Sequence, residues 1–381
     1  MKDIKIVIGA NYGDEGKGMV ANHFTKENTI MVLDNGTAQR GHTVDYKDGY
    51  RHVFHHFGSG MRKGARTYYG PEFLIHPMEY TREYVELYKD GMAIPDGYYD
   101  GLCKVITPYD MLIDHMTEDF IAIENGEREY GSCGFGSWCA THRFKHFPQS
   151  VIHMSSKLTN KEFYEAEMKA VWDGCLGILA RRGVALDKLT KYNDYFNYDS
   201  QIQKNLREHF YSDIIFFLAH NREVDFNTLW KETDNFVFEM GQGLGLDHSV
   251  GVWHTTSNTG LQNPYNLLKD KQDYSAEVCY VTRSYLTRHG KGPLEENVRK
   301  DEINSTMVDR TNVHNEFQGS LRYGYLELAD QKARIENDWA RIGGDPHFKQ
   351  ALVVTHCNEF NCEFDNSKYY SDNKFEVKVR E

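Results

Sequence analysis

The sequence contains little proline and no paired cysteines. Only 8 of its 381 residues are proline, and its seven cysteines are scattered without a Cys-x-x-Cys spacing. Isolated cysteines in a chain of this length are typical of a reduced compartment, and they provide neither a disulfide framework nor a cysteine-based metal set. We therefore expect a cytoplasmic protein.

Long apolar runs and an excess of positive charge are also missing. The formal net charge is −12, and no apolar run approaches the ~20 residues that span a bilayer. The first three residues lead directly into a strand-like run, which leaves no space for a signal peptide. Without a basic field, we expect neither a nucleic acid nor a membrane as partner, so local lysines, arginines and helix ends must hold any anionic substrate.

A glycine-rich stretch near the start carries the strongest chemical signal. The β-branched run Ile4–Ile8 predicts a buried strand, Gly9–Gly18 a turn, and Met19–Phe24 the first turns of a helix. This order directs backbone N–H groups and the positive end of a helix toward a phosphate. The turn also carries three charged side chains, Asp14, Glu15 and Lys17. A turn selected only for tightness does not need them.

The stretch departs from a Walker A motif. Gly9 lies too far from Gly16-Lys17, and Gly18 replaces the serine or threonine that would bind magnesium. The magnesium ligand must therefore come from elsewhere, and Asp14 is the nearest candidate. The alternative is a glycine-rich surface turn without a ligand.

The segment Tyr12–Gly18 resembles the signature loop of adenylosuccinate synthetases, which usually has tryptophan in its first position. Further blocks similar to this family follow in the same order: Arg40–Thr43, Gly58–Gly60, Gly131–Gly136, Phe238–Gly243, Thr255–Asn258 and Thr287–Pro293. The resemblance implies a C–N ligase that joins L-aspartate to a purine monophosphate with a nucleoside triphosphate and Mg²⁺. It also implies a homodimer.

The order of predicted elements favours an α/β fold. Strand-like runs such as Ile4–Ile8 and Thr29–Leu33 alternate with turn-rich and helical segments, which predicts a mostly parallel central sheet with its ligands at the carboxyl ends of the strands. We expect a single domain over residues 1–381. Its nucleotide-binding core would cover 1–150, a helical excursion about 155–232, and the resumed core 233–381.

The resemblance implies roles for the residues of the first two loops. Asp14 would take a proton from purine N1, His42 would act as general acid, and Lys17 would offset charge on the leaving diphosphate. Asp14 and the carbonyl of Gly41 would hold the metal. The nucleotide and its phosphates would be bound by Asn11, Gly13, Glu15, Gly16, Gly18, Thr43 and Asn358.

The resemblance also implies a site for the purine monophosphate. Its residues would be Gln39, Ser132, Cys133, Gln242, Thr255, Thr256 and Arg143. Arg143 or Lys145 would supply the basic group that crosses the dimer interface to the partner's phosphate. Phe135 stands where the family has an arginine, so the resemblance implies that this chain lacks one carboxylate contact.

Two departures from the family pattern bear on the substrates. The arginine-rich loop that grips aspartate is reduced to Arg322, and Thr311, Asn312 and Arg322 are the candidates for a rebuilt aspartate site. This thinning resembles the phage-type branch, which amidates dGMP and would act in the host cytoplasm. Retention of Asp14 points instead toward IMP, with GTP as donor.

The second departure concerns the phosphoryl donor. Asn358, with His356, replaces a Lys-x-Asp pattern whose aspartate reads guanine. An amide both donates and accepts, which suits adenine, so we expect ATP or dATP. A protein that has kept the fold but acts only as a nucleotide sensor is the more distant alternative.

Overall fold

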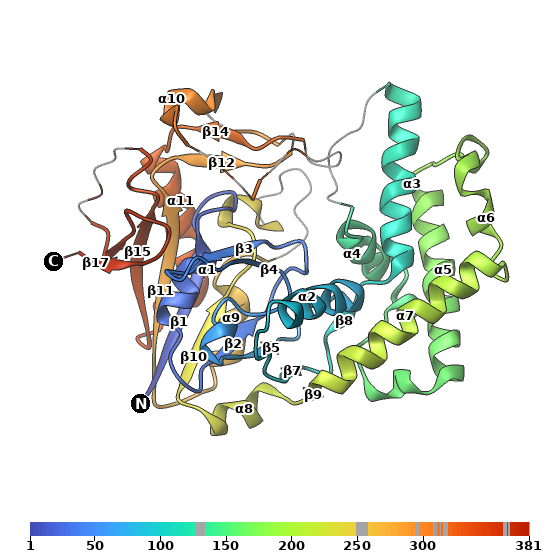
Figure 1. Cartoon of the computed structure of the whole chain (residues 1–381), viewed down its shortest axis with the longest axis horizontal. Coiled ribbons are helices and arrows are strands. Elements are labelled where there is room, and N and C mark those ends of the chain that lie inside the picture. Colours follow the sequence, from blue (N-terminus) through green and yellow to red (C-terminus); the bar gives the residue numbers. More distant parts are fainter. Residues whose placement is uncertain are drawn as a thin grey trace.

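The computed structural model describes residues 1–126, 134–248, 258–290, 292–294, 297–307, 309, 311–312, 314, 319–360, 364 and 366–380. The ten strands that these residues contribute to the central sheet have the order β17-β16-β15-β11-β1-β10-β2-β5-β7-β9. Within this described sheet every neighbouring pair is parallel except β16 and β17. The predicted α/β fold with a mostly parallel sheet is therefore confirmed (Figure 1).

The strands of this sheet are β1 (Lys2–Gly9), β2 (Ile30–Leu33), β5 (Arg66–Tyr69), β7 (Gly97–Tyr99), β9 (Asn221–Glu223), β10 (Asn235–Glu239), β11 (Tyr274–Arg283), β15 (Phe348–Thr355), β16 (Tyr369–Tyr370) and β17 (Lys378–Val379). Smaller sheets pair β3 (His42–Asp45) with β4 (Arg51–Phe54), β6 (Leu74–Ile75) with β8 (Lys104–Val105), and β14 (Arg322–Gly324) with both β12 (Leu286–Arg288) and β13 (Asn297–Val298).

The two faces of the central sheet are covered by different helices. Ile4, Ile6 and Ile8 of β1 pack in one core with side chains of α8 (Phe226–Glu232), α9 (Gln262–Leu268) and α11 (Leu328–Trp339). Val7 points to the opposite face and packs in another core with α1 (Lys17–Phe24). Because side chains alternate along a strand, a continuous apolar run such as β1 can serve both cores.

A helical region lies beside the β7–β9 end of the sheet, far from β15–β17 (Figure 1). It contains α3 (Pro108–Asn125), α4 (Ser137–His146), α5 (Lys161–Arg181), α6 (Asn193–Phe196) and α7 (Gln201–His220), and α2 (Pro77–Lys89) packs on α7. The short α10 (Lys300–Asn304) lies near β14. Tyr109, Trp172 and Phe217 belong to the core of this region, which accounts for part of the aromatic content.

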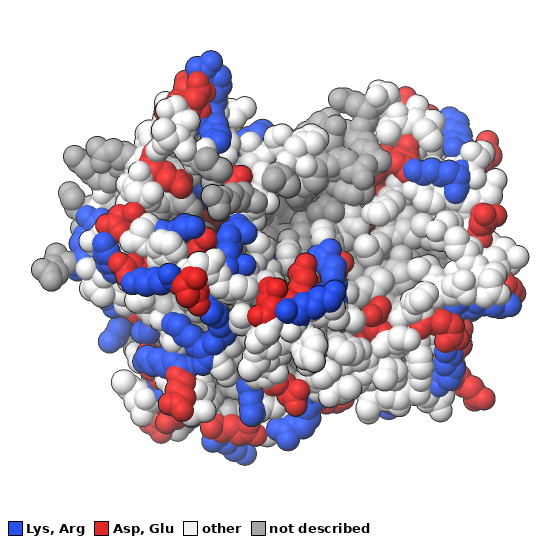
Figure 2. All heavy atoms as spheres, viewed as in Figure 1, with Lys and Arg blue, Asp and Glu red and all other residues white. Residues whose placement is uncertain are grey.

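Charges of both signs alternate over the visible surface of the sheet-containing part (Figure 2). This pattern agrees with a chain that lacks a one-sign field. None of the helices in the described part of the chain combines the length and the apolar character needed to span a bilayer. The carboxyl ends of β1, β2, β10, β11 and β15 point to one edge, where the loops that follow them meet.

Candidate active site

The glycine-rich loop has the predicted strand–turn–helix form. β1 ends at Gly9 and α1 begins at Lys17. Three loop residues adopt positive φ angles: Gly13 at 95°, Asp14 at 60° and Gly16 at 87°. Asp14 is a non-glycine residue in the left-handed region, a conformation that costs of order 1–3 kcal/mol and is common at functional sites.

The carboxylate of Glu15 organises this loop from inside. It accepts hydrogen bonds from Asn11 N at 3.1 Å and from Lys17 Nζ at 2.6 Å, and only 2% of Glu15 is exposed. Two glycines keep the space open, since a Cβ at Gly9 or Gly243 would lie 2.5 or 2.6 Å from its oxygens. The carboxylate of Glu15 is thus occupied within the protein, and a direct contact from it to a nucleotide is not supported.

Asn11 and Gly13, two other residues expected to bind nucleotide, line neither of the cavities described below. The Asn11 amide is buried, donates to Thr282 Oγ1 at 2.8 Å and accepts from Arg334 Nη2 at 2.7 Å. This side chain therefore ties the loop to β11 and α11. The prediction that it contacts nucleotide does not fit these partners.

The carboxylate of Asp14 faces a cavity, and both this carboxylate and the backbone carbonyl of the same residue have partners. His289 Nε2 lies 3.3 Å from Asp14 Oδ2, and Arg283 Nε donates to the Asp14 carbonyl. Burial would raise the pKa of Asp14, but His289, Arg283 and Lys17 together lower it to about 2. The same contact with Asp14 raises the pKa of His289, against the effect of burial. These contacts therefore favour the ionised form of the Asp14 carboxylate, which suits a cation.

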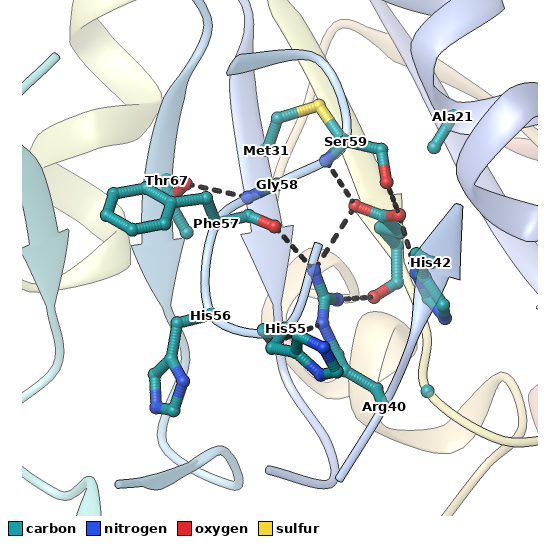
Figure 3. Close-up of polar contacts among 12 residues, drawn as sticks. Ala21, Met31, Arg40, His42, His55, His56, Phe57, Gly58, Ser59 and Thr67 are labelled. Carbon is teal, nitrogen blue, oxygen red and sulfur yellow. Dashed lines mark hydrogen bonds and ion pairs between the residues drawn. The ribbon is translucent and has the colours of Figure 1, made fainter. Parts of the chain in front are cut away.

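His42 is fixed by a buried carboxylate at the end of β10 (Figure 3). His42 Nδ1 lies 2.6 Å from Glu239 Oε1, and Ser59 donates to the same carboxylate from its N–H at 2.9 Å and from its hydroxyl. Burial would raise the pKa of Glu239, but Arg40 and His42 lower it to about 2. Burial lowers the pKa of His42 to about 4, even though Glu239 raises it. An anionic Glu239 fixes the proton of neutral His42 on Nδ1 and leaves Nε2 for the cavity.

A cavity of about 460 Å³ gathers most of the residues predicted to act on the triphosphate. It is formed by the loop before α1, the start of β3, the end of β11 and the segments around 309–312 and 356–359. The predicted residues along its wall are Asp14, Gly16, Lys17, Gly18, Gly41, His42, Thr43, Thr311, Asn312 and Asn358. We call it the first cavity.

The far end of the first cavity lies after β15. Asn358 is exposed there, and Glu359, Asn373 and Lys374 also line this part of the wall. His356 adopts a φ of 58°, and its carbonyl accepts from Ser284 Oγ at 3.0 Å. The two residues that replace the family's Lys-x-Asp thus both line the first cavity.

A second cavity of about 540 Å³ lies on the other side of the loop 35–43. Gln39 and Gln242, two of the residues predicted to bind the purine monophosphate, both line it. Gln39 accepts a hydrogen bond from Ser137 Oγ at 2.8 Å, and Gln242 adopts a φ of 60°. The remaining wall includes the basic side chains of Lys104, His142 and Lys145. The predicted residues Ser132, Cys133, Thr255 and Thr256 lie outside the described residues.

The prediction for Arg143 is wrong. Its side chain is completely buried, and its guanidinium binds Asp110 through two contacts, Nε–Oδ1 and Nη2–Oδ2, both of 2.8 Å. Its Nη1 donates to the carbonyl of Ser150. A guanidinium committed in this way cannot reach a phosphate or cross an interface. Lys145, the other candidate, is exposed and lines the second cavity.

Arg322 lies next to a second arginine that was given no role from the sequence. It faces Arg288 across the β12–β14 pair and does not line the first cavity. Arg322 Nη2 donates to the carbonyl of Gly292, and Arg288 lies 4.7 Å over the Tyr12 ring. The buried Nε atoms of both arginines have no partner among the described residues. Burial and the adjacent Arg322 lower the pKa of Arg288.

Sequence reasoning assigned no role to Glu239, Arg283, Arg288 and His289. Glu239 lies in the block Phe238–Gly243, and Arg288 and His289 lie in Thr287–Pro293, so proximity to those blocks was the available signal. Their contacts depend on strand pairing across more than 190 residues, which the sequence does not display.

Comparison with known sequences gives a consistent result. The family model for adenylosuccinate synthetase matches residues 6–337. The adenylosuccinate synthetase of Marinomonas sp. is 26% identical over 296 residues, which cover 76% of this chain but 63% of that enzyme. The enzyme of Thermodesulfovibrio yellowstonii is 24% identical over 340 residues, covering 85% of this chain and 72% of the relative. The chain thus spans about two thirds of the length of these relatives.

Solved structures show the same fold. Fully ligated adenylosuccinate synthetase from Plasmodium falciparum superimposes with a TM-score of 0.67 at 18% identity, covering 93% of this chain and 77% of that one. The succinoaminodeoxyadenylate synthetase of cyanophage S-2L, bound to dGMP and dATP, gives a TM-score of 0.62 at 14% identity, covering 100% of this chain and 95% of that one. With a family model that matches most of its length, this chain belongs to the adenylosuccinate synthetase family, a family of C–N ligases.

Proposed function

We propose that the protein joins L-aspartate to C6 of dGMP, with ATP or dATP as phosphoryl donor. The products would be N6-succino-2-amino-2′-deoxyadenylate, phosphate and the corresponding diphosphate. The observation that carries this proposal is the placement of the two cavities on either side of the loop 35–43. The first contains Asp14, Lys17 and His42, and the second contains Gln39 and Gln242.

The first step needs a base beside the purine and positive charge beside the phosphates. Ionised Asp14 takes the proton from purine N1, so that the 6-oxygen becomes anionic and attacks the γ-phosphorus. Lys17, at the start of α1, offsets charge on the leaving diphosphate together with the N-terminal N–H groups of that helix. A triphosphate in the first cavity would raise the pKa of His42 above its value of about 4, because an adjacent anion favours the imidazolium. His42 can then donate a proton from Nε2.

The donor set of the first cavity fits Mg²⁺. The ionised carboxylate of Asp14 and the carbonyl of Gly41 are hard oxygen ligands, and both residues line the cavity. Bound there, the ion would neutralise charge on the triphosphate oxygens.

The second step brings the amine of aspartate to C6, from which phosphate leaves. We propose that Arg288 and Arg322 bind the carboxylates of aspartate, because their partnerless Nε atoms are buried side by side and no acidic residue among the described ones pairs with them. Bidentate contacts from arginine to carboxylate are strong and directional. Thr311 and Asn312, on the wall of the first cavity, would complete the site.

The choice of dGMP rests on the thinned arginine loop and on the cyanophage structure, whose bound ligands are dGMP and dATP. An adenylosuccinate synthetase acting on IMP with GTP is the second candidate, because Asp14 is retained and the relatives from Marinomonas and Thermodesulfovibrio carry that name.

The deciding experiment compares kcat/KM for dGMP, GMP and IMP with aspartate and ATP. We expect dGMP to be preferred about tenfold or more. A preference for IMP refutes the substrate, and no turnover with any of the three, despite nucleotide binding, indicates a sensor.

A homodimer also remains part of the proposal, with Lys145 in place of Arg143 as the basic group near the monophosphate phosphate. Light scattering of the purified protein, with and without monophosphate, tests the assembly. A monomer that turns over at full rate would refute it.

A further inference from the structure

We propose that Arg40 is a positioning residue for His42 and acts through the carboxylate of Glu239. The inference rests on the proposed function, in which His42 faces the reacting phosphates. Arg40 lies two residues before His42 in the chain (Figure 3). Its guanidinium makes no hydrogen bond to the imidazole and contacts Glu239 instead.

The guanidinium of Arg40 is locked in place. Only 1% of its side chain is exposed. Nε donates to the carbonyl of His55 and Nη2 to that of Phe57, both at 2.8 Å. These two carbonyls belong to the turn that follows β4, so the position of the guanidinium is set by backbone and not by flexible side chains. A planar group held at both edges can orient a third partner.

That third partner is Glu239, which Arg40 contacts at two points. Arg40 Nη1 lies 3.4 Å from the Glu239 carbonyl oxygen, and Nη2 lies 3.6 Å from Oε2. Oε2 also accepts from the Ser59 N–H, and Oε1 is left for the Ser59 hydroxyl and His42 Nδ1. Arg40 thus supplies the buried positive charge on the side of the carboxylate opposite the imidazole. Without it, a fully buried carboxylate would keep only neutral donors and the histidine.

The consequence for His42 is orientational. With Glu239 ionised and fixed, the proton of the ring stays on Nδ1 and Nε2 points to the first cavity. If the carboxylate were protonated or rotated, the ring could turn or change tautomer, and Nε2 would lose its place beside the phosphates. Arg40 itself lines the second cavity, while His42 lines the first. Although Arg40 lines the second cavity, its guanidinium is committed to backbone carbonyls and to Glu239. We therefore expect substitution of Arg40 to affect the chemical step and not binding of the monophosphate.

The test uses Arg40→Met and Arg40→Lys in the full-length protein, with whichever monophosphate the wild type turns over. We expect Arg40→Met to lower kcat roughly 10²-fold, within the range attributed to a positioned acid–base group, while KM for the monophosphate changes less than about threefold. Arg40→Lys, which keeps the charge, should recover a measurable part of kcat. Arg62→Met, on a partly exposed arginine paired with Asp48, is the control and should leave kcat unchanged.

A double-mutant cycle with Glu239→Gln separates the path through Glu239 from a direct effect. In the Glu239→Gln background, Arg40→Met should lower kcat by less than about threefold. Multiplicative losses, or a raised KM with unchanged kcat, would overturn the proposal in favour of a direct substrate contact.

Nitrogen-15 NMR of histidine provides a readout that needs no substrate, so it remains decisive if the ligase activity itself is refuted. At one fixed pH, wild-type His42 should show the Nδ1–H tautomer with a strongly hydrogen-bonded Nδ1, and Arg40→Met should lose that signature while the other histidine signals of the folded protein stay in place. An unchanged His42 signal would refute the positioning role.

Discussion

His289 Nε2 lies 3.3 Å from Asp14 Oδ2 and 3.0 Å from Asn312 Oδ1, so one imidazole nitrogen joins the first glycine-rich loop to the segment around residue 312. Asp309 ends this series of contacts, because its Oδ2 accepts a hydrogen bond from Asn312 Nδ2 at 2.7 Å. The carboxylate that we propose as base and metal ligand is therefore oriented from outside its own loop.

Asp14→Asn should lower kcat by about 10²–10⁴-fold, because the amide can neither take the N1 proton nor hold Mg²⁺ as an anion. Nucleotide affinity at saturating Mg²⁺, measured by calorimetry, should change much less. A variant that keeps more than a tenth of wild-type kcat would contradict the role of Asp14.

His289→Leu should raise the pKa of Asp14, since the contact with His289 is the largest of those that lower it. The ionised carboxylate becomes protonated as pH falls through its pKa. Because the variant raises that pKa, the acid limb of the kcat/KM profile should move to higher pH. Profiles recorded with His289→Gln, which keeps a neutral donor, provide the control. An unmoved acid limb in both variants would mean that Asp14 does not set it.

Asn358→Asp should shift the phosphoryl donor from ATP toward GTP. Hydrogen bonds to a charged carboxylate are worth about 1.5–3 kcal/mol, so the ratio of kcat/KM values for the two donors should change by about tenfold or more. Initial rates with ATP, dATP and GTP at matched Mg²⁺ measure it. A wild type that prefers GTP would overturn the assignment of Asn358.

Arg288→Met and Arg322→Met should each raise KM for aspartate by roughly tenfold to a hundredfold and leave KM for the monophosphate nearly unchanged, because the lost charge-assisted contacts serve only the amino acid. Arg299→Met removes the same charge at an exposed position paired with Glu302 and serves as control. Equal effects of all three substitutions would point to general electrostatics and not to a site.

Asp34→Asn should stabilise the protein under alkaline conditions. Burial raises the pKa of Asp34 to about 8, and its Oδ1 accepts from the backbone N–H of Glu72, as an amide oxygen also can. A carboxyl with a raised folded pKa contributes stability that is full below its unfolded pKa of about 4 and lost as pH rises toward 8. Melting temperatures should therefore be similar at pH 5 and a few degrees higher for the variant at pH 8–9. If wild type and variant had the same melting temperature at both pH values, ionisation of Asp34 would not lower the stability of the folded protein.

The parts of the fold that depend on local pattern could be predicted from the sequence. The buried strand before Gly9 and the helix after the glycine-rich turn follow from apolar runs, although the helix begins at Lys17, two residues before the predicted start at Met19. The prediction for Arg143 was wrong because the sequence near a motif does not show whether a basic side chain faces solvent or pairs with an acid elsewhere. Its partner, Asp110, lies 33 positions earlier. The internal role of the Glu15 carboxylate was hidden for a related reason, since the space that receives it is kept open by Gly243 from another strand end. Such pairings become visible only when the strand order is known.

The narrow wall between the two cavities has a pharmacological consequence. Arg40, Gly41 and His42 are consecutive, and the first lines one cavity while the other two line its neighbour. Under the proposed function, a single compound with a purine head beside Gln242 and a polyphosphate chain beside Lys17 would occupy both cavities at once. The tether of such a bisubstrate inhibitor would pass this three-residue partition, and the tether length that binds best would report the separation of the two bound substrates.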